Sequence, residues 1–93
     1  MIRSFGTADT ERIWNEEYVQ SVDRRLQRVV LRKLELINAA VGLADLRIPP
    51  GNRLEQLKAD RRGQWSIRVN DQWRICFEWR DGDADSVELV DYH

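Results

Sequence analysis

The last three residues of the chain, Asp91-Tyr92-His93, carry side chains that could move protons and contact a nucleic-acid base. His93 is the only histidine among the 93 residues, and histidine has an ordinary pKa of about 6.5, which allows proton transfer near neutral pH. The alternative is a frayed terminal residue without a role. Alternation along a strand places Tyr92 on one face and its two neighbours on the other, so a regular strand does not direct all three side chains to one site.

Two arginines, Arg68 and Arg74, are expected to stand opposite each other on neighbouring strands. Guanidinium groups at that spacing repel unless an anion or a carboxylate lies between them, so the pair is a candidate anion site. Three further basic residues precede the pair: Lys58, Arg61 and Arg62. The alternative is a set of ordinary surface ion pairs. The acidic partners would then be Glu78, Glu88 or Asp91.

The opposition of these arginines follows from a predicted hairpin. Apolar and polar residues alternate over 65–69 and again over 73–80, which is the period of a β-strand. A three-residue loop at 70–72 places every apolar residue of the two strands on one face. The resulting pairs are Val69 with Trp73, Arg68 with Arg74, Ile67 with Ile75, and Trp65 with Phe77.

A second hairpin and a short strand complete the predicted sheet. A loop at Asp81-Gly82-Asp83 connects the strand over 73–80 to the end of the chain. The predicted pairs are Phe77 with Val87, Ile75 with Leu89, and Arg74 with Val90. Leu54 and Leu57 bound a short strand earlier in the chain, and residues 2–5 alternate as a short edge strand.

Two helices are predicted before the main strands. Residues 26–41 carry apolar side chains at spacings of three and four, with Ser21 as the expected N-cap and Gly42 as the expected terminator. Residues 7–9 are cap-type residues for a shorter helix that continues to Tyr18. A solvent-facing stripe on the longer helix consists of Arg24, Arg25, Arg28 and Arg32. Residues 48–52, with two prolines, predict a turn or extended connector.

These elements predict an α+β fold, with two N-terminal helices packed on a small antiparallel sheet in a single domain spanning 1–93. No run approaches the roughly 18–20 apolar residues of a membrane helix, and the start lacks a signal-peptide core, so we expect a cytoplasmic protein without a membrane partner. A single cysteine, Cys76, beside one histidine predicts neither a disulfide framework nor a zinc cluster, so no metal or other cofactor is expected.

Charge is segregated along the chain, although its net value is −1. Residues 24–33 hold five basic and no acidic side chains, whereas residues 81–93 hold five acidic and no Lys or Arg side chains. One face could therefore bind a polyanion while the whole chain stays near neutral. Trp65, Trp73 and Trp79 could stack on bases, but they fall on the apolar face, which favours core packing.

Taken together, the motifs resemble the HigB branch of the RelE/ParE toxin superfamily. They are LEQLKADRRGQWSIRVN at 54–70, QWRICF at 72–77, GDA at 82–84 and VDYH at 90–93, with MIRSF at the start and PPGNR at 49–53. The resemblance implies two N-terminal helices over an antiparallel sheet. It also implies a toxin of a type II toxin–antitoxin pair that cleaves translated mRNA in the ribosomal A site. Its expected partners are a HigA-like helix-turn-helix antitoxin, the ribosome and mRNA, with operator DNA bound only through the antitoxin complex.

The family's active site falls on Lys58, Arg74, Asp91, Tyr92 and His93. Cleavage without a metal requires the ribose 2′-OH to attack the adjacent phosphate, so fixed cations such as Lys58 and Arg74 would stabilise the phosphorane. His93 is the expected general acid, and Tyr92 is expected to stack on or orient a base. The expected RNA-binding residues are Arg53, Arg61, Arg62 and Arg68.

One position departs from some members of this family, which have a histidine where this chain has Glu55. A carboxylate beside cations is a weak base at neutral pH, so Glu55 as the catalytic base predicts milder activity. The runner-up interpretation is a ParE-like inhibitor of DNA gyrase that performs no RNA chemistry. A degenerate RNA-binding module is the third. The arginine stripe on the longer helix is the expected contact surface for the antitoxin.

Overall fold

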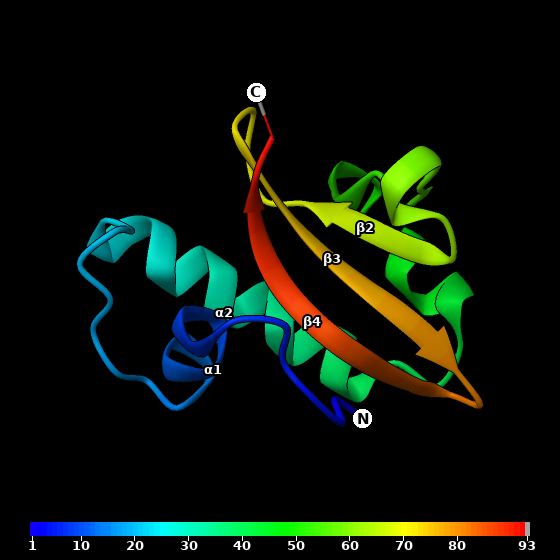
Figure 1. Ribbon diagram of the computed structural model, residues 1–93, viewed down its shortest axis with the longest axis horizontal. Coiled ribbons are helices and arrows are strands. Elements are labelled where there is room, and N and C mark those ends of the chain that lie inside the picture. Colours follow the sequence, from blue (N-terminus) through cyan, green and yellow to red (C-terminus); the bar gives the residue numbers. More distant parts are fainter. Residues whose placement is uncertain (93) are drawn as a thin grey trace.

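Two helices pack on one face of a four-stranded antiparallel sheet in the computed structural model, which describes residues 1–92 (Figure 1). The elements are α1 (Ala8–Trp14), α2 (Arg24–Ala39), β1 (Glu55–Gln56), β2 (Gln64–Arg68), β3 (Trp73–Arg80) and β4 (Asp83–Asp91). The sheet order is β1-β2-β3-β4, so each strand pairs with its neighbour in the sequence. The predicted α+β architecture is confirmed. Within the described residues, no helix is long and apolar enough to cross a membrane.

The long helix α2 begins and ends at residues other than those predicted. Asp23, not Ser21, is the N-cap, and its carboxylate accepts a hydrogen bond from the Leu26 amide at 2.9 Å. Ser21 instead donates its hydroxyl proton to Asp9 at 3.2 Å. The helix stops at Ala39, three residues before Gly42, because the backbone of Ala40 is already extended. Gly42 begins the short 3₁₀ helix η1 (Leu43–Arg47).

The elements at the start of the chain are shorter than the sequence predicts. Thr7 caps α1 as expected, since its hydroxyl accepts from the Thr10 amide, but the helix ends at Trp14 and leaves Tyr18 outside. Glu16, with a left-handed φ of 62°, follows that end. The predicted strand over 2–5 is reduced to two isolated parallel bridges to β4. The prolyl connector turns through a second 3₁₀ helix, η2 (Pro50–Asn52).

The register between β2 and β3 is the one that alternation predicts. Arg68 faces Arg74, Ile67 faces Ile75 and Trp65 faces Phe77 across the pair. A Val69–Trp73 backbone hydrogen bond of 2.9 Å closes the three-residue loop.

The β3–β4 loop has two residues instead of the predicted three. Arg80 pairs with Asp83 across Asp81-Gly82, both of which have positive φ, as in a tight hairpin turn. An irregularity between Cys76 and Glu78 then shifts the register by one residue, so Phe77 does not pair with Val87. Beyond that bulge the predicted pairs, Ile75 with Leu89 and Arg74 with Val90, are confirmed.

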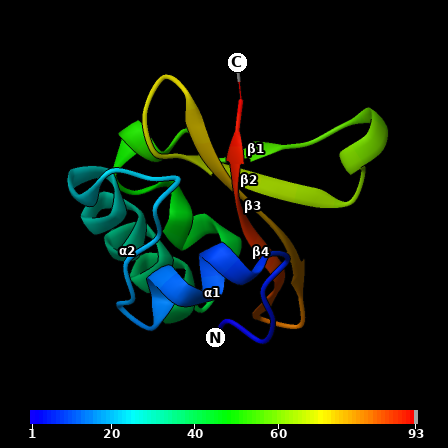
Figure 2. The same cartoon turned by 60° about the vertical axis from the view of Figure 1, so that its left-hand side comes forward.

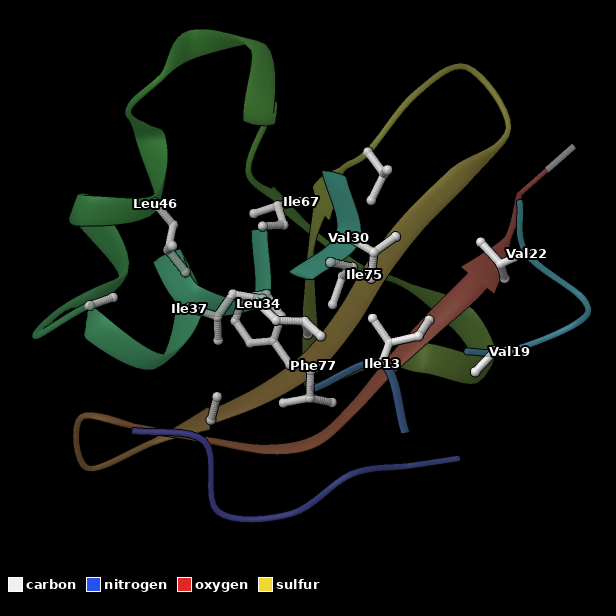
Figure 3. Packing of buried hydrophobic residues seen from close by; sticks show 14 residues of the cluster. Ile13, Val19, Val22, Val30, Leu34, Ile37, Leu46, Ile67, Ile75 and Phe77 are labelled. Atoms are coloured by element: carbon white, nitrogen blue, oxygen red, sulfur yellow. The ribbon is translucent and has the colours of Figure 1, made fainter. Parts of the chain in front are cut away.

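The core lies between α2 and the facing side of the sheet (Figure 3). Val30, Leu34 and Ile37 of α2 are fully buried, as are the sheet residues Ile67, Ile75 and Phe77. The three sheet tryptophans that the sequence placed on this face pack partly buried against the cluster: Trp65, Trp73 and Trp79. Burying one face of the sheet leaves the opposite face, which we call the outer face, to the polar residues of each strand.

Candidate active site on the outer face of the sheet

The centre of the outer face is a row of three residues across the sheet. Ser66 of β2 pairs with Cys76 of β3, which pairs with Glu88 of β4. Ser66 and Cys76 are fully buried although they face away from α2. Larger polar side chains must therefore cover them, and those side chains make up the site.

Arg74 is the best-anchored cation of the site. Its Nε donates to the Ser66 hydroxyl at 2.8 Å, and its Nη2 donates to the backbone carbonyl of Arg53 at 2.8 Å. The Glu55 carboxylate of β1 lies 3.8 Å from Nη2. Only 12% of the Arg74 side chain is exposed. These contacts fix the position of the guanidinium on the outer face of the sheet.

The carboxylates expected to neutralise Arg68 and Arg74 have other partners. Glu78 pairs with Arg80 at 3.2 Å, and Glu88 pairs with Arg61 at 2.7 Å. Arg68 instead pairs with Asp71 in the middle of the hairpin loop. The two arginines therefore do not share one anion between them, because each finds an acceptor closer along the chain or on β1.

The ion pair of Arg61 and Glu88 is close enough to Cys76 for both charges to act on its thiol. Arg61 also donates to the Gln64 side chain at 3.0 Å, and the hydrogen bond to Glu88 raises the pKa of the guanidinium. Burial raises the pKa of the Cys76 thiol, so the thiol is protonated at neutral pH. Arg61, predicted to bind RNA, already has an internal carboxylate partner.

Tyr92 joins the outer face where β4 ends. Its phenol is close enough to Cys76, Arg61 and Arg74 for their charges to affect it, and burial is the main reason that its pKa is raised. Its backbone amide donates to the Gln72 carbonyl at 2.5 Å, which fastens the chain end to the β2–β3 loop. Both views place the end of β4 beside that loop (Figures 1 and 2). Tyr92 is therefore a neutral phenol beside Arg74.

Asp91 points elsewhere, as alternation predicts for a neighbour of Tyr92. Its carboxylate accepts a hydrogen bond of 3.1 Å from the Gln72 side chain at the hairpin loop. The predicted general acid, His93, lies outside the described residues.

The remaining predicted residues surround this centre. Lys58 is exposed two residues after β1, where it is the N-cap of the 3₁₀ helix η3 (Ala59–Arg61), and the exposed Arg62 is the C-cap of that helix. Arg53 is exposed and contributes its backbone carbonyl to Arg74. The structure thus brings Glu55, Arg61, Arg74 and Tyr92 together.

Sequence reasoning missed Ser66 and Cys76 as parts of this site. Alternation does place both on the polar face, and the predicted hairpin pairs them with each other. Their complete burial was not predictable from the pattern, because it depends on side chains from β1, β4 and the β1–β2 connection.

The arrangement suits a bound anion. A guanidinium with fixed orientation stabilises negative charge without reorganising, which is the requirement for a phosphate whose charge increases during a reaction. The neutral phenol beside it offers an aromatic surface and a hydroxyl proton.

The two-helix, four-strand architecture is the RelE/YoeB-like α+β fold. The chain is similar in structure to the "YoeB-YefM complex from Staphylococcus aureus", with a TM-score of 0.64 and 16% identity over 100% of this chain and 98% of that one. A family model described as "RelE-like toxin of type II toxin-antitoxin system HigB" matches residues 3–93. The chain belongs to this family of HigB-like toxins.

Curated relatives agree with that assignment. "Toxin HigB-1" of Vibrio cholerae is 43% identical over 77 residues, which are 76% of this chain and 81% of the relative. "Endoribonuclease HigB" of Proteus vulgaris is 32% identical over 97 residues, covering 100% of both chains. A toxin of a type II system acts with an antitoxin, so this chain has such a partner.

Proposed function

We propose that this toxin is a ribosome-dependent endoribonuclease that cleaves translated mRNA in the A site. The observation that carries the proposal is the Arg74 guanidinium, which Ser66 and the Arg53 carbonyl hold on the outer face beside the Tyr92 phenol. The printed name of the Proteus vulgaris relative, an endoribonuclease, supports the same chemistry.

The reaction needs no metal in this mechanism. The ribose 2′-oxygen attacks the adjacent phosphorus and loses its proton to a base, the phosphorus–O5′ bond breaks, and an acid protonates the departing 5′-oxygen. The products are a 2′,3′-cyclic phosphate and a 5′-hydroxyl. Arg74 and Lys58 stabilise the charge on the phosphorane, while His93 supplies the proton to the leaving oxygen. Glu55, 3.8 Å from Arg74, is the candidate base within the described residues.

Tyr92 positions the RNA in this proposal. Its raised pKa keeps the phenol protonated at neutral pH, so it donates a hydrogen bond or stacks on an unpaired base instead of repelling phosphate. Arg53 and Arg62, both exposed, extend the cationic surface for the RNA backbone. Arg61 and Arg68 contribute less, because each is already paired with a carboxylate.

The antitoxin is proposed to bind the arginine stripe of α2, which we expect to leave the outer face of the sheet open. The four arginines of the stripe are exposed: Arg24, Arg25, Arg28 and Arg32. The first turn of α2 contains no acidic residue, so apart from the N-cap Asp23 the start of the helix carries cations. An acidic segment of a HigA-like partner would relieve the repulsion among them. Figure 1 shows the N-terminal half of α2, in cyan, extending away from the sheet.

A binding assay tests this surface. Charge reversal of Arg28 and Arg32 is expected to weaken antitoxin binding by about tenfold or more, since each removes an attraction and adds a repulsion. Unchanged affinity would contradict the assignment of this stripe.

We further propose that the toxin works as a single domain in the cytoplasm and meets operator DNA only through the antitoxin complex.

Mapping of mRNA 5′-ends soon after induction tests the proposed activity. The wild-type toxin is compared with Arg74→Ala and with deletion of His93, each of which should still bind antitoxin. We expect cuts linked to codons inside translated regions, absent in both variants. Growth arrest without such cuts would indicate a gyrase inhibitor of the ParE type, and no arrest would indicate a degenerate RNA-binding module.

A further inference from the structure

The orientation of Arg74 is set mainly by two short hydrogen bonds, with a longer one of 3.5 Å from Nη2 to the Ser66 carbonyl. The Ser66 hydroxyl accepts from Nε and the Arg53 carbonyl accepts from Nη2, both at 2.8 Å. Ser66 is fully buried, so its hydroxyl cannot turn to solvent in exchange. Two bonds to different nitrogens fix a planar group in both direction and rotation, and within the described residues Nη1 has no hydrogen-bond partner.

The second acceptor depends on an unusual backbone conformation. Arg53 has φ 44° and ψ 56°, in the left-handed region, which is unfavourable for a residue other than glycine. Such conformations persist only where the surrounding structure holds them, and they concentrate at functional positions. Here the conformation accompanies a carbonyl that accepts from Arg74.

Asn52, the residue before it, holds the connector in place. Its side chain is fully buried, and its amide nitrogen donates to the carbonyls of Leu46 and Ile48 at 3.2 and 3.3 Å. Its amide oxygen accepts from Lys33 of α2 at 2.5 Å. A hydrogen bond from Lys33 of α2 to Asn52, the peptide bond from Asn52 to Arg53, and the hydrogen bond from Arg74 to the Arg53 carbonyl therefore connect α2 to Arg74.

We propose that Ser66 and Asn52 are positioning residues that orient Arg74 toward the scissile phosphate, Ser66 directly and Asn52 through the Arg53 carbonyl. The inference rests on the proposed endoribonuclease function for its kinetic consequence. Its structural consequence, a fixed Arg74 guanidinium, is independent of that function and can be measured without substrate.

Single-turnover cleavage of mRNA on programmed ribosomes, with toxin in excess, tests the role of Ser66. Ser66→Ala removes one hydroxyl and is expected to lower the maximal rate by about tenfold or more while leaving the half-saturating toxin concentration little changed, because misorientation affects the transition state. Ser21→Ala, which removes an exposed serine hydroxyl in the loop before α2, is the matched control and should cleave at the wild-type rate.

A double-mutant cycle separates positioning from a general structural role. If Ser66 acts through Arg74, Ser66→Ala should have little further effect in an Arg74→Met background, whereas independent effects multiply. Multiplying losses, or a Ser66→Ala variant with the wild-type rate, would overturn the proposal for Ser66.

Asn52→Ala would remove every side-chain hydrogen bond that holds the connector, so the role of Asn52 is tested through its donor with Lys33→Met. Losing the Lys33 donor should loosen Asn52 and lower the cleavage rate several-fold in the wild type but not in the Arg74→Met background. An unchanged rate would remove Asn52 from the proposal.

NMR of the Arg74 Nε–H group distinguishes failure of the positioning from failure of the proposed function. The wild-type proton should exchange slowly with water, and Ser66→Ala should accelerate exchange by about tenfold or more, since the bond to a buried acceptor is lost. A protected Nε–H in a protein that cleaves no mRNA would refute the function and keep the positioning. Equal exchange in both proteins would refute the positioning.

Discussion

Replacing Arg74 by methionine removes the cation of the proposed site while keeping an unbranched side chain. The wild-type guanidinium makes two hydrogen bonds of 2.8 Å and lies 3.8 Å from Glu55. Of its partner residues, Ser66 is fully buried; it accepts through its hydroxyl and, at 3.5 Å, through its backbone carbonyl. The Arg53 carbonyl can bind water in the variant, because that residue is exposed.

The expected loss of stability is too small to unfold the variant at 25 °C. Leaving the buried Ser66 hydroxyl without its donor costs about 1–3 kcal/mol, and the contact with the exposed Glu55 contributes about 0–1 kcal/mol. A loss of about 2 kcal/mol lowers the Tm by about 8–16 °C in a domain of this size. With a starting stability of about 5 kcal/mol or more, over about 99% of the variant remains folded at 25 °C.

The expected loss of activity is much larger than unfolding can explain. Removing one fixed donor from a developing oxyanion lowers kcat by about 10²–10³-fold, or about 2.7–4 kcal/mol in the barrier. Cleavage of ribosome-bound mRNA and a thermal melt on the same samples measure the two effects separately.

Arg80→Met is the matched control, because Arg80 ends the same strand and is 70% exposed beside Glu78. It should change stability by at most about 0.5 kcal/mol and leave kcat unaltered. An Arg74→Met protein that cleaves at the wild-type rate would refute the catalytic role of the guanidinium. Equal losses in both variants would show that general charge, not this site, governs the rate.

Three further outcomes are expected. Leu34→Ala should destabilise the fold by about 2–5 kcal/mol in chemical denaturation, because Leu34 is fully buried in the core; a smaller loss would mean that the site collapses around the cavity. Arg3 and the terminal amine hold the pKa of Asp83 below its ordinary 3.8, so the ion pair stabilises the fold above that pH and its contribution falls as pH drops through the lower, folded pKa. The Tm difference between wild type and Asp83→Asn should therefore be constant well above pH 3.8 and shrink below it; a difference independent of pH would contradict the linkage. Arg61→Ala should increase the rate at which a thiol reagent modifies Cys76 by about tenfold or more, since a long side chain near the buried thiol is removed, and an unchanged rate would show that other groups cover it.

The sequence predicted most of the sheet because alternation and loop length are local properties. Once the strand over 64–68 must turn its apolar residues to one face, a three-residue loop is the choice that pairs Arg68 with Arg74. The β3–β4 turn shows the limit of that reasoning. Asp81 and Gly82 form a two-residue turn and a bulge restores the register, so a wrong loop length still gave the correct pair of Arg74 with Val90.

Helix ends were less predictable, because several nearby residues are chemically able to cap. Ser21 and Asp23 are both good N-caps, and the choice went to Asp23 while Ser21 bonded to Asp9 of α1. Which residue caps the helix therefore depends on the hydrogen bond between Ser21 and Asp9, which are twelve residues apart in the sequence.

By itself, the sequence determined the α+β class, the register of β2 with β3 and the positions of Glu55, Arg74 and Tyr92 on or beside the sheet. Only the tertiary structure decided which charges are already paired, so that Glu88 neutralises Arg61 and Asp71 neutralises Arg68. It also decided how Arg74 is held, through a buried serine and the backbone carbonyl of Arg53, 21 residues away. The physical reason is that alternation fixes the face on which a side chain lies, whereas hydrogen bonds and desolvation depend on whichever groups the folded chain brings within about 3 Å.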